Sequence, residues 1–213
     1  MDWFAAVDIY CERTDLGFWG EPFNALSNAA FPLAAFWAAA EARQRATPPV
    51  IWVLIAIAAM IGAGSFLFHS FANTWSGLAD VIPIWSFVAL FIFVAIQRIG
   101  GVQPGKLIAT ALAIAAVLTA VFLATGEGEN TTAVAATVPD PLNGSQQYAP
   151  ALLALLVFCF ASWRRKHPMR NWILAATLIF MASLVFRTID PAICAKFPRG
   201  SHFMWHILNG VII

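Results

Sequence analysis

Seven long stretches without a charged residue dominate this sequence and limit what the chain can fold into. They cover residues 22–40, 50–68, 81–96, 107–125, 148–163, 172–186 and 201–213. A helix that crosses a bilayer needs about 20 apolar residues, and fewer where flanking side chains reach the interface. Only 11% of the 213 residues are charged, against about 25% in soluble proteins. The sequence predicts an all-α polytopic membrane protein, one domain over residues 1–213 with seven transmembrane helices and an extramembrane segment at 1–21.

Basic residues in short connections predict the orientation. Eight of the twelve Lys and Arg residues lie in the first, third and fifth connections, whereas the connection 126–147 has acids but no base. Because basic loops stay on the inner side, we expect the N-terminus outside and the C-terminus inside. The net charge of +1 argues against a nucleic-acid partner, which would need a basic face, and no feature indicates a protein partner.

Ionisable side chains are costly inside a membrane and mark functional sites there. Ser65 and His69 end the second predicted span, Asp80 opens the third, and His202 and His206 open the seventh. The predicted topology brings all five to the outer leaflet, near the periplasmic or lumenal face.

The spacing of the histidines points to a metal ion. Residues four apart share a helical face, so His202 and His206 could coordinate one ion and His69 could supply a third ligand. Three protein ligands and an open position are typical of catalytic zinc. Asp80 could then act as general base, and Ser65 could bind the developing oxyanion or orient the water. The alternatives are hydrogen bonds between helices, or a haem held by His69 and one of the other histidines.

Several motifs together resemble the alkaline ceramidases, which belong to the CREST superfamily of membrane hydrolases with the adiponectin receptors. The matching stretches are residues 62–69, Asp80, residues 201–210, residues 10–12 with 21–28, and residues 190–194. The resemblance implies zinc on His69, His202 and His206. It also implies that Ser65 and Asp80 help to hydrolyse the amide of ceramide, a membrane lipid, to sphingoid base and fatty acid. The Ala-rich composition points to a bacterial member.

The resemblance also implies a calcium ion near the zinc, bound by the N-terminal segment. Its matching residues are Asp8, the carbonyl of Tyr10, Glu12 and Glu21. Carboxylates and carbonyls suit calcium. However, Asp8 stands one residue further from the cysteine than in the family, and Thr14 replaces an Asn. The alternative is that these acids cap the first helix.

Cys11 and Cys194 both fall on the predicted outer face, and relatives show the same pair. An oxidising compartment permits a disulfide there, so we hypothesise one. Cys159 lies within the fifth span, where packing is expected. Arg187 and Asp190, three residues apart, could form an ion pair across one helical turn. Alternatively, Asp190 could orient a zinc ligand.

Two alternatives for the function stay open. The first is a receptor-like member of the superfamily with the same metal site and little turnover. The second is an amidase for another long-chain lipid amide. A transporter would fit the topology, but the sequence has no pair of discontinuous helices in corresponding halves.

Overall fold

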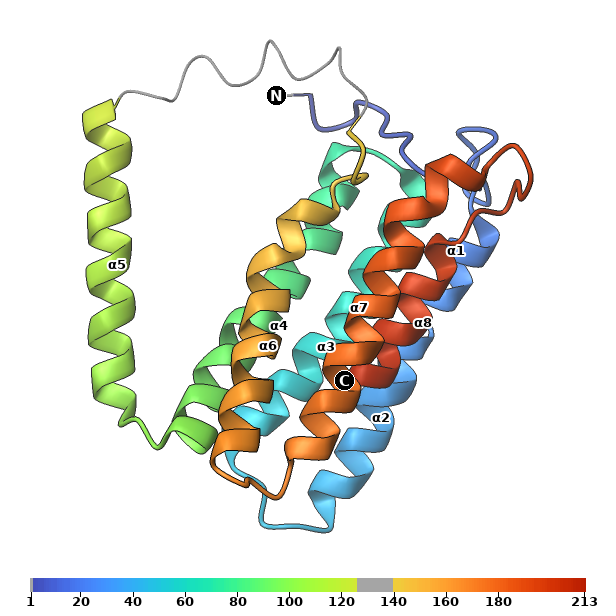
Figure 1. Cartoon of the computed structure of the whole chain (residues 1–213). Coiled ribbons are helices and arrows are strands. Elements are labelled where there is room, and N and C mark those ends of the chain that lie inside the picture. The colour runs from blue at the N-terminus through green and yellow to red at the C-terminus, as the bar shows by residue number, and fades with distance from the viewer. Residues whose placement is uncertain (1, 126–139) are drawn as a thin grey trace.

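The computed structural model describes residues 2–125 and 140–213, and this part of the chain is all-α (Figure 1). Its helices are α1 (Pro22–Ser27), α2 (Ala30–Arg43), α3 (Pro49–Phe71), α4 (Thr74–Gly100), α5 (Pro104–Thr125), the 3-10 turn η1 (Ser145–Tyr148), α6 (Ala149–Arg164), α7 (Arg170–Ile193) and α8 (His202–Ile212). The seven longer helices, α2 to α8, correspond to the seven predicted spans. Much of the predicted connection 126–147 lies outside the described residues.

Four of the described helical segments are long and apolar enough to cross a membrane: α3, α4, η1 with α6, and α7. Large apolar side chains also cover the outside of α2, where Phe36 is 76% and Trp37 is 71% exposed. Contiguous exposed apolar surface of this kind marks contact with lipid or a partner. The chain is therefore an integral membrane protein.

The first predicted span is not one helix, because it breaks between α1 and α2. Pro32 has no N–H to donate to the carbonyl of Asn28, as a continuous helix would require. That carbonyl instead accepts the N–H of Phe31 at 3.2 Å, in a tighter turn. The break leaves α1 as a short separate helix whose buried face carries Asn24.

The helices α3 and α4 form a hairpin whose two arms touch closely. A Cβ atom on Gly64 would lie 2.0 Å from the carbonyl oxygen of Ala79, so only glycine permits this approach. Asn73 caps α4 and forms a capping box with Ser76. The sequence predicted Asp80 at the start of this helix. Because the helix already begins at Thr74, Asp80 lies in its second turn instead.

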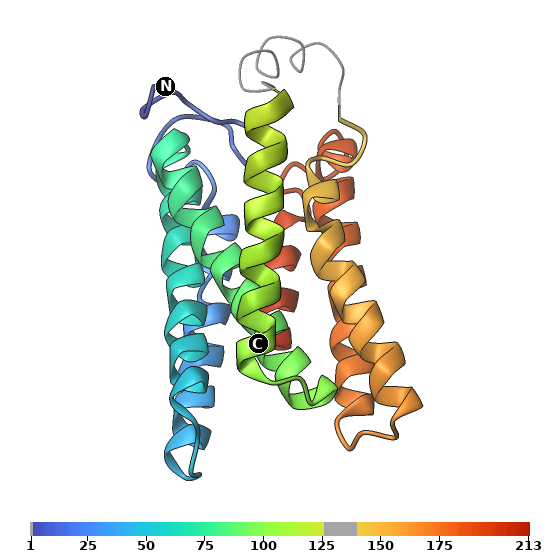
Figure 2. The same ribbon diagram turned by 90° about the vertical axis from the view of Figure 1, so that its left-hand side faces the viewer.

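The ends of the helices that carry the candidate residues meet at one end of the bundle, the upper end in Figure 1. There the N-terminal segment is tied to the α3–α4 turn by a β-bridge between Ala6 and Asn73 and by the N–H of Val7, 2.8 Å from the carbonyl of Ala72. The short α2–α3, α4–α5 and α6–α7 connections lie at the opposite end. The helix α5 stands apart from the other helices in Figure 1, and in Figure 2, where that side faces the viewer, it lies in front of them.

Candidate metal centre and active site

Three histidines from two helices converge at the upper end of the bundle. His69 comes from the last turn of α3, and His202 and His206 come from successive turns of α8. All three are at most 2% exposed, and one ligand nitrogen from each lies within 4.8 Å of the others. Within the described residues, this is the one group of three or more His, Cys, Asp or Glu side chains placed to hold a metal ion. The structure thus brings together the three residues that the sequence predicted.

Two of these rings have a hydrogen-bond partner at Nδ1, which favours the tautomer with a free Nε2. Glu21 Oε2 lies 2.6 Å from Nδ1 of His69, and a carboxylate can only accept, so Nδ1 carries the proton. Ser27 Oγ donates to the carbonyl of Asn24 at 2.8 Å and lies 2.8 Å from Nδ1 of His206. With its hydroxyl proton directed at that carbonyl, Ser27 can accept the Nδ1–H of His206. In that arrangement both neutral rings present an unprotonated Nε2 to a metal ion.

The two Nε2 atoms face each other, 3.2 Å apart. At this distance either one ring donates its Nε2–H to the other, or both Nε2 lone pairs face a shared cation. Nitrogen atoms that share one tetrahedral zinc, each about 2.0–2.1 Å from it, lie roughly 3.3 Å apart. The residues present therefore fit a metal ion, and outer partners such as Glu21 and Ser27 are the usual companions of metal-bound imidazoles.

Ser65 and Asp80 meet beside this centre at the close contact of α3 with α4. The Ser65 hydroxyl lies close to the Asp80 carboxylate. Ser65 is 3% exposed, and Oδ1 of Asp80 is buried without a hydrogen-bond partner. A shielded carboxylate oxygen that lacks a donor is available to accept a proton or a hydrogen bond from a bound molecule.

An apolar cavity of about 180 Å³ lies deeper in the bundle, between α3, α4, α6, α7 and α8. Trp205, which lines it, lies between the ligand candidates His202 and His206 on α8. Except for Asn209, the side chains of its walls are aliphatic or aromatic. The cavity suits a hydrocarbon group.

A comparison with known families agrees with these features. The model of the family described as Ceramidase matches residues 10–213. The chain belongs to the ceramidase family. The match includes every residue of the centre described above, and it implies a hydrolase. No curated protein sequence matches the chain significantly.

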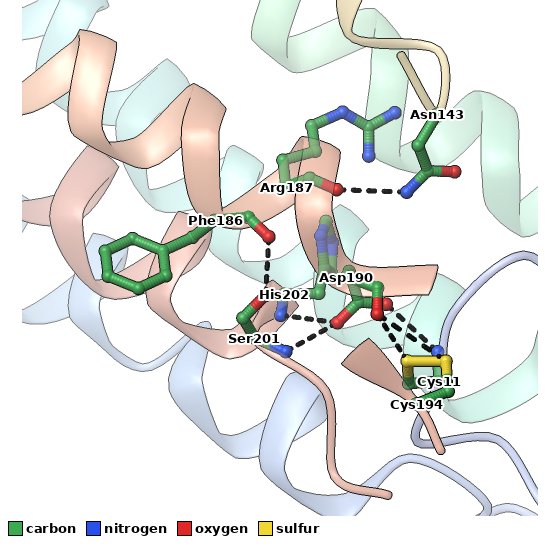
Figure 3. The surroundings of a disulfide bond; sticks show 8 residues. All are labelled: Cys11, Asn143, Phe186, Arg187, Asp190, Cys194, Ser201 and His202. Atoms are coloured by element: carbon green, nitrogen blue, oxygen red, sulfur yellow. Dashed lines mark hydrogen bonds between the residues drawn. A yellow bond between two sulfur atoms is a disulfide. The ribbon is translucent and has the colours of Figure 1, made fainter. Parts of the chain in front are cut away.

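In this ceramidase-family protein, a disulfide and an aspartate hold the start of α8. Cys11 and Cys194 form a disulfide with Cα atoms 5.3 Å apart, as hypothesised. Asp190 accepts the backbone N–H groups of Cys11, Ser201 and His202 at 3.0, 2.6 and 2.9 Å (Figure 3). Gly200 adopts φ +62°, and a Cβ there would lie 2.1 Å from Asp190 Oδ1, so the aspartate reaches these amides because residue 200 is glycine.

The ion pair proposed between Arg187 and Asp190 is absent, and that prediction is wrong. Figure 3 shows the Arg187 side chain directed away from the carboxylate. Its guanidinium donates to the hydroxyl of Tyr10 at 2.8 Å and lies against the rings of Tyr10, Tyr148 and Trp205. Asp190 orients His202 through its backbone and not through its ring, because the amides at the start of α8 are the nearer donors.

Tyr10 connects this cation to the histidine cluster. Its ring stacks on His202 with centroids 3.7 Å apart and an interplanar angle of 17°. Burial raises the pKa of the Tyr10 hydroxyl well above its usual value, although Arg187 opposes the shift. The side chain thus serves as a neutral wall of the centre, while the predicted role of the Tyr10 carbonyl as a calcium ligand stays a prediction.

The structure gives the predicted calcium-binding acids other partners. Glu12 accepts the backbone N–H groups of Phe23 and Asn24 at 2.6 and 2.7 Å and so caps α1, while Asp8 is exposed. Burial raises the pKa of Glu12 despite these hydrogen bonds. Burial also raises the pKa of Glu21, but the hydrogen bonds from His69 and Asn24 and the charge of Arg13 lower it by more, and the net shift is downward. The calcium site stays a prediction.

Sequence reasoning missed Ser27 and gave Glu21 a different role. Glu21, Asn24 and Ser27 follow one another at intervals of three, which places them on one face of α1. Asn24 is fully buried and donates to Oε2 of Glu21 at 2.9 Å. The sequence did contain a signal for these roles. Polar residues recur at helical spacing just before a proline that interrupts the apolar stretch.

Proposed function

We propose that the protein is a zinc-dependent amidase that hydrolyses the N-acyl bond of ceramide, giving a sphingoid base and a fatty acid. The observation that supports the proposal is the buried cluster of His69, His202 and His206, in which the Nε2 atoms of His69 and His206 face each other at 3.2 Å next to Asp80. Family membership supports the substrate class. His202 would complete the set of zinc ligands.

Bound at these histidines, zinc would lower the pKa of a water molecule to about 7 and polarise the amide carbonyl. Asp80 accepts the proton of the attacking water as its oxygen bonds to the carbonyl carbon. The C–N bond then breaks, and Asp80 returns the proton to the departing amine nitrogen. Ser65 holds the carboxylate in place or donates its hydroxyl hydrogen to the developing oxyanion.

The acyl chain would occupy the apolar cavity beside Trp205. Because the carbonyl carbon must lie near the histidines, a chain bound there would run from the upper end of the bundle into the hydrocarbon region. The lipid would enter sideways from the outer leaflet, since the basic connections at the opposite end favour the inner side of the membrane. On this proposal the active site lies near the periplasmic or lumenal face.

The experiment is detection of free sphingoid base by mass spectrometry after the purified protein has been incubated with ceramide in detergent micelles. His206→Ala serves as the blank. Product from the wild type alone would support the proposal. If ceramide and a panel of other long-chain lipid amides all gave no product, the proposal would fail and the receptor-like alternative would be favoured.

A further inference from the structure

Arg13 places a buried positive charge directly behind the histidine cluster. Its side chain is 1% exposed, although it belongs to the extramembrane N-terminal segment. Nε donates to Glu21 Oε1 at 2.5 Å, and the two terminal nitrogens donate to the carbonyls of Asp15 and His69 at 3.0 and 2.8 Å. All three guanidinium nitrogens thus donate hydrogen bonds to oxygen atoms.

Glu21 joins this guanidinium to the metal centre. Its Oε1 accepts from Arg13, and its Oε2 accepts from Nδ1 of His69. One carboxylate therefore bridges a fixed cation and a ligand candidate. The guanidinium also holds the main chain of that same histidine, so it fixes both the backbone and the ring of His69.

The oxygen atoms around Arg13 are those that a hard cation such as calcium would need. Here the guanidinium occupies the space between them. The other acid of the segment, Glu12, has both oxygens bound to the amides of α1. The donor set that the family resemblance implies for calcium does not fit that ion in this chain.

We infer that Arg13 is a positioning residue that takes the place of a calcium ion, neutralising Glu21 and holding it against His69. The inference deepens the proposed zinc function and rests on it for the role of His69. The exclusion of calcium rests only on the contacts of Arg13 and Glu12. A buried, fully bound guanidinium differs from Arg45, whose ion pair with Glu41 lies on the surface with side chains 75% and 48% exposed.

The test compares the wild type with Arg13→Gln and with Arg45→Gln as matched control. Each protein is dialysed in detergent against millimolar calcium chloride, and bound calcium is measured by elemental mass spectrometry. Zinc affinity is measured separately by competition with a chromogenic chelator. We expect no bound calcium in the wild type and an approximately tenfold loss of zinc affinity in Arg13→Gln, the size typical of outer-shell partners, with no loss in Arg45→Gln.

Stoichiometric calcium in the wild type would overturn the inference, and so would an Arg13→Gln protein with wild-type zinc affinity. If Arg13→Gln does not fold, Arg13→Lys keeps the charge and carries the test. It should still exclude calcium and bind zinc more weakly than the wild type, and calcium uptake by it would contradict the inference. A wild type that binds no zinc and yields no sphingoid base would refute the proposed function, whereas the calcium measurement would keep its meaning.

Discussion

The two halves of the helical bundle bury different kinds of side chain. At the upper end, the largest side chains that are fully buried are polar, among them the three histidines, Glu21 and Asp190. Deeper in the bundle, the cavity is lined almost wholly by apolar side chains. A buried polar group without a partner costs about 1–3 kcal/mol, so the upper end is stable only when each of its polar groups has a hydrogen-bond partner. The apolar cavity has no such requirement, and its shape decides what it can bind. Substitutions at the upper end should therefore affect metal and chemistry, and those in the cavity should affect only the choice of lipid.

The largest effect is expected from His206→Ala. It removes one Nε2 of the facing pair and leaves Ser27 without its donor, so zinc binding and amidase activity should both be lost. Elemental analysis and product detection measure the two losses. His167→Ala, outside the cluster, is the matched control, and zinc retained in His206→Ala would refute the ligand assignment.

Asp80→Asn should separate chemistry from metal binding. The amide keeps the shape of the carboxylate but cannot accept the proton of water, and loss of a general base lowers turnover by about 10²–10⁴-fold. Zinc content should equal that of the wild type. The exposed Asp140→Asn serves as control, and an Asp80→Asn enzyme with normal turnover would exclude the proposed base.

Cys11→Ser tests how the N-terminal segment is attached to the start of α8. Loss of a native disulfide costs about 2–5 kcal/mol, and each kcal/mol lowers the melting temperature by roughly 2–4 °C in a chain of this size. Thermal unfolding in detergent measures the shift. Cys159→Ser removes the free thiol and should leave the melting temperature unchanged, and equal values for both variants would show that the disulfide adds no stability.

Ser27→Ala should weaken zinc binding without abolishing it. The variant removes the acceptor of the Nδ1–H of His206, and partners of this kind contribute about 10–100-fold in metal affinity. Competition with a chelator gives the affinity. Restoration by Ser27→Thr, which keeps a hydroxyl acceptor, would support the hydrogen bond as the cause, and wild-type affinity in Ser27→Ala would exclude it.

The smallest effect is expected in the apolar half. Ala154 lines the cavity, and leucine there would shorten the space for an acyl chain at a cost of about 1–3 kcal/mol from overpacking. Turnover should shift towards ceramides with shorter chains while zinc content stays constant. If turnover depended on acyl-chain length as in the wild type, the cavity would not be part of the substrate site.

Several features were predictable because they depend on local pattern. The helices follow from long charge-free stretches, and the pairing of His202 with His206 follows from the helical repeat. The disulfide agreed with the predicted face of both cysteines. The break before Pro32 could also have been predicted from the proline. It was missed because residues 22–40 form one apolar stretch long enough for a single span.

Other features depend on contacts between residues far apart in the chain. Glu21 was expected to bind calcium, yet it lies against Arg13 and His69, the latter 48 positions away. Arg187 and Asp190 looked like a pair because they are neighbours on a helix. In the structure, Asp190 accepts the amides of Cys11 and of the start of α8, and Arg187 faces aromatic rings.

The sequence by itself determined that this chain is an apolar all-α protein with three histidines and an aspartate able to meet at one end. Hydropathy and spacing are enough for that, because a helix in lipid satisfies its own backbone. Only the tertiary structure decided which partner each buried charge takes. Several acceptors compete for each donor there, and burial makes every unmatched group costly, so the choice depends on which groups the packed helices bring within hydrogen-bonding distance.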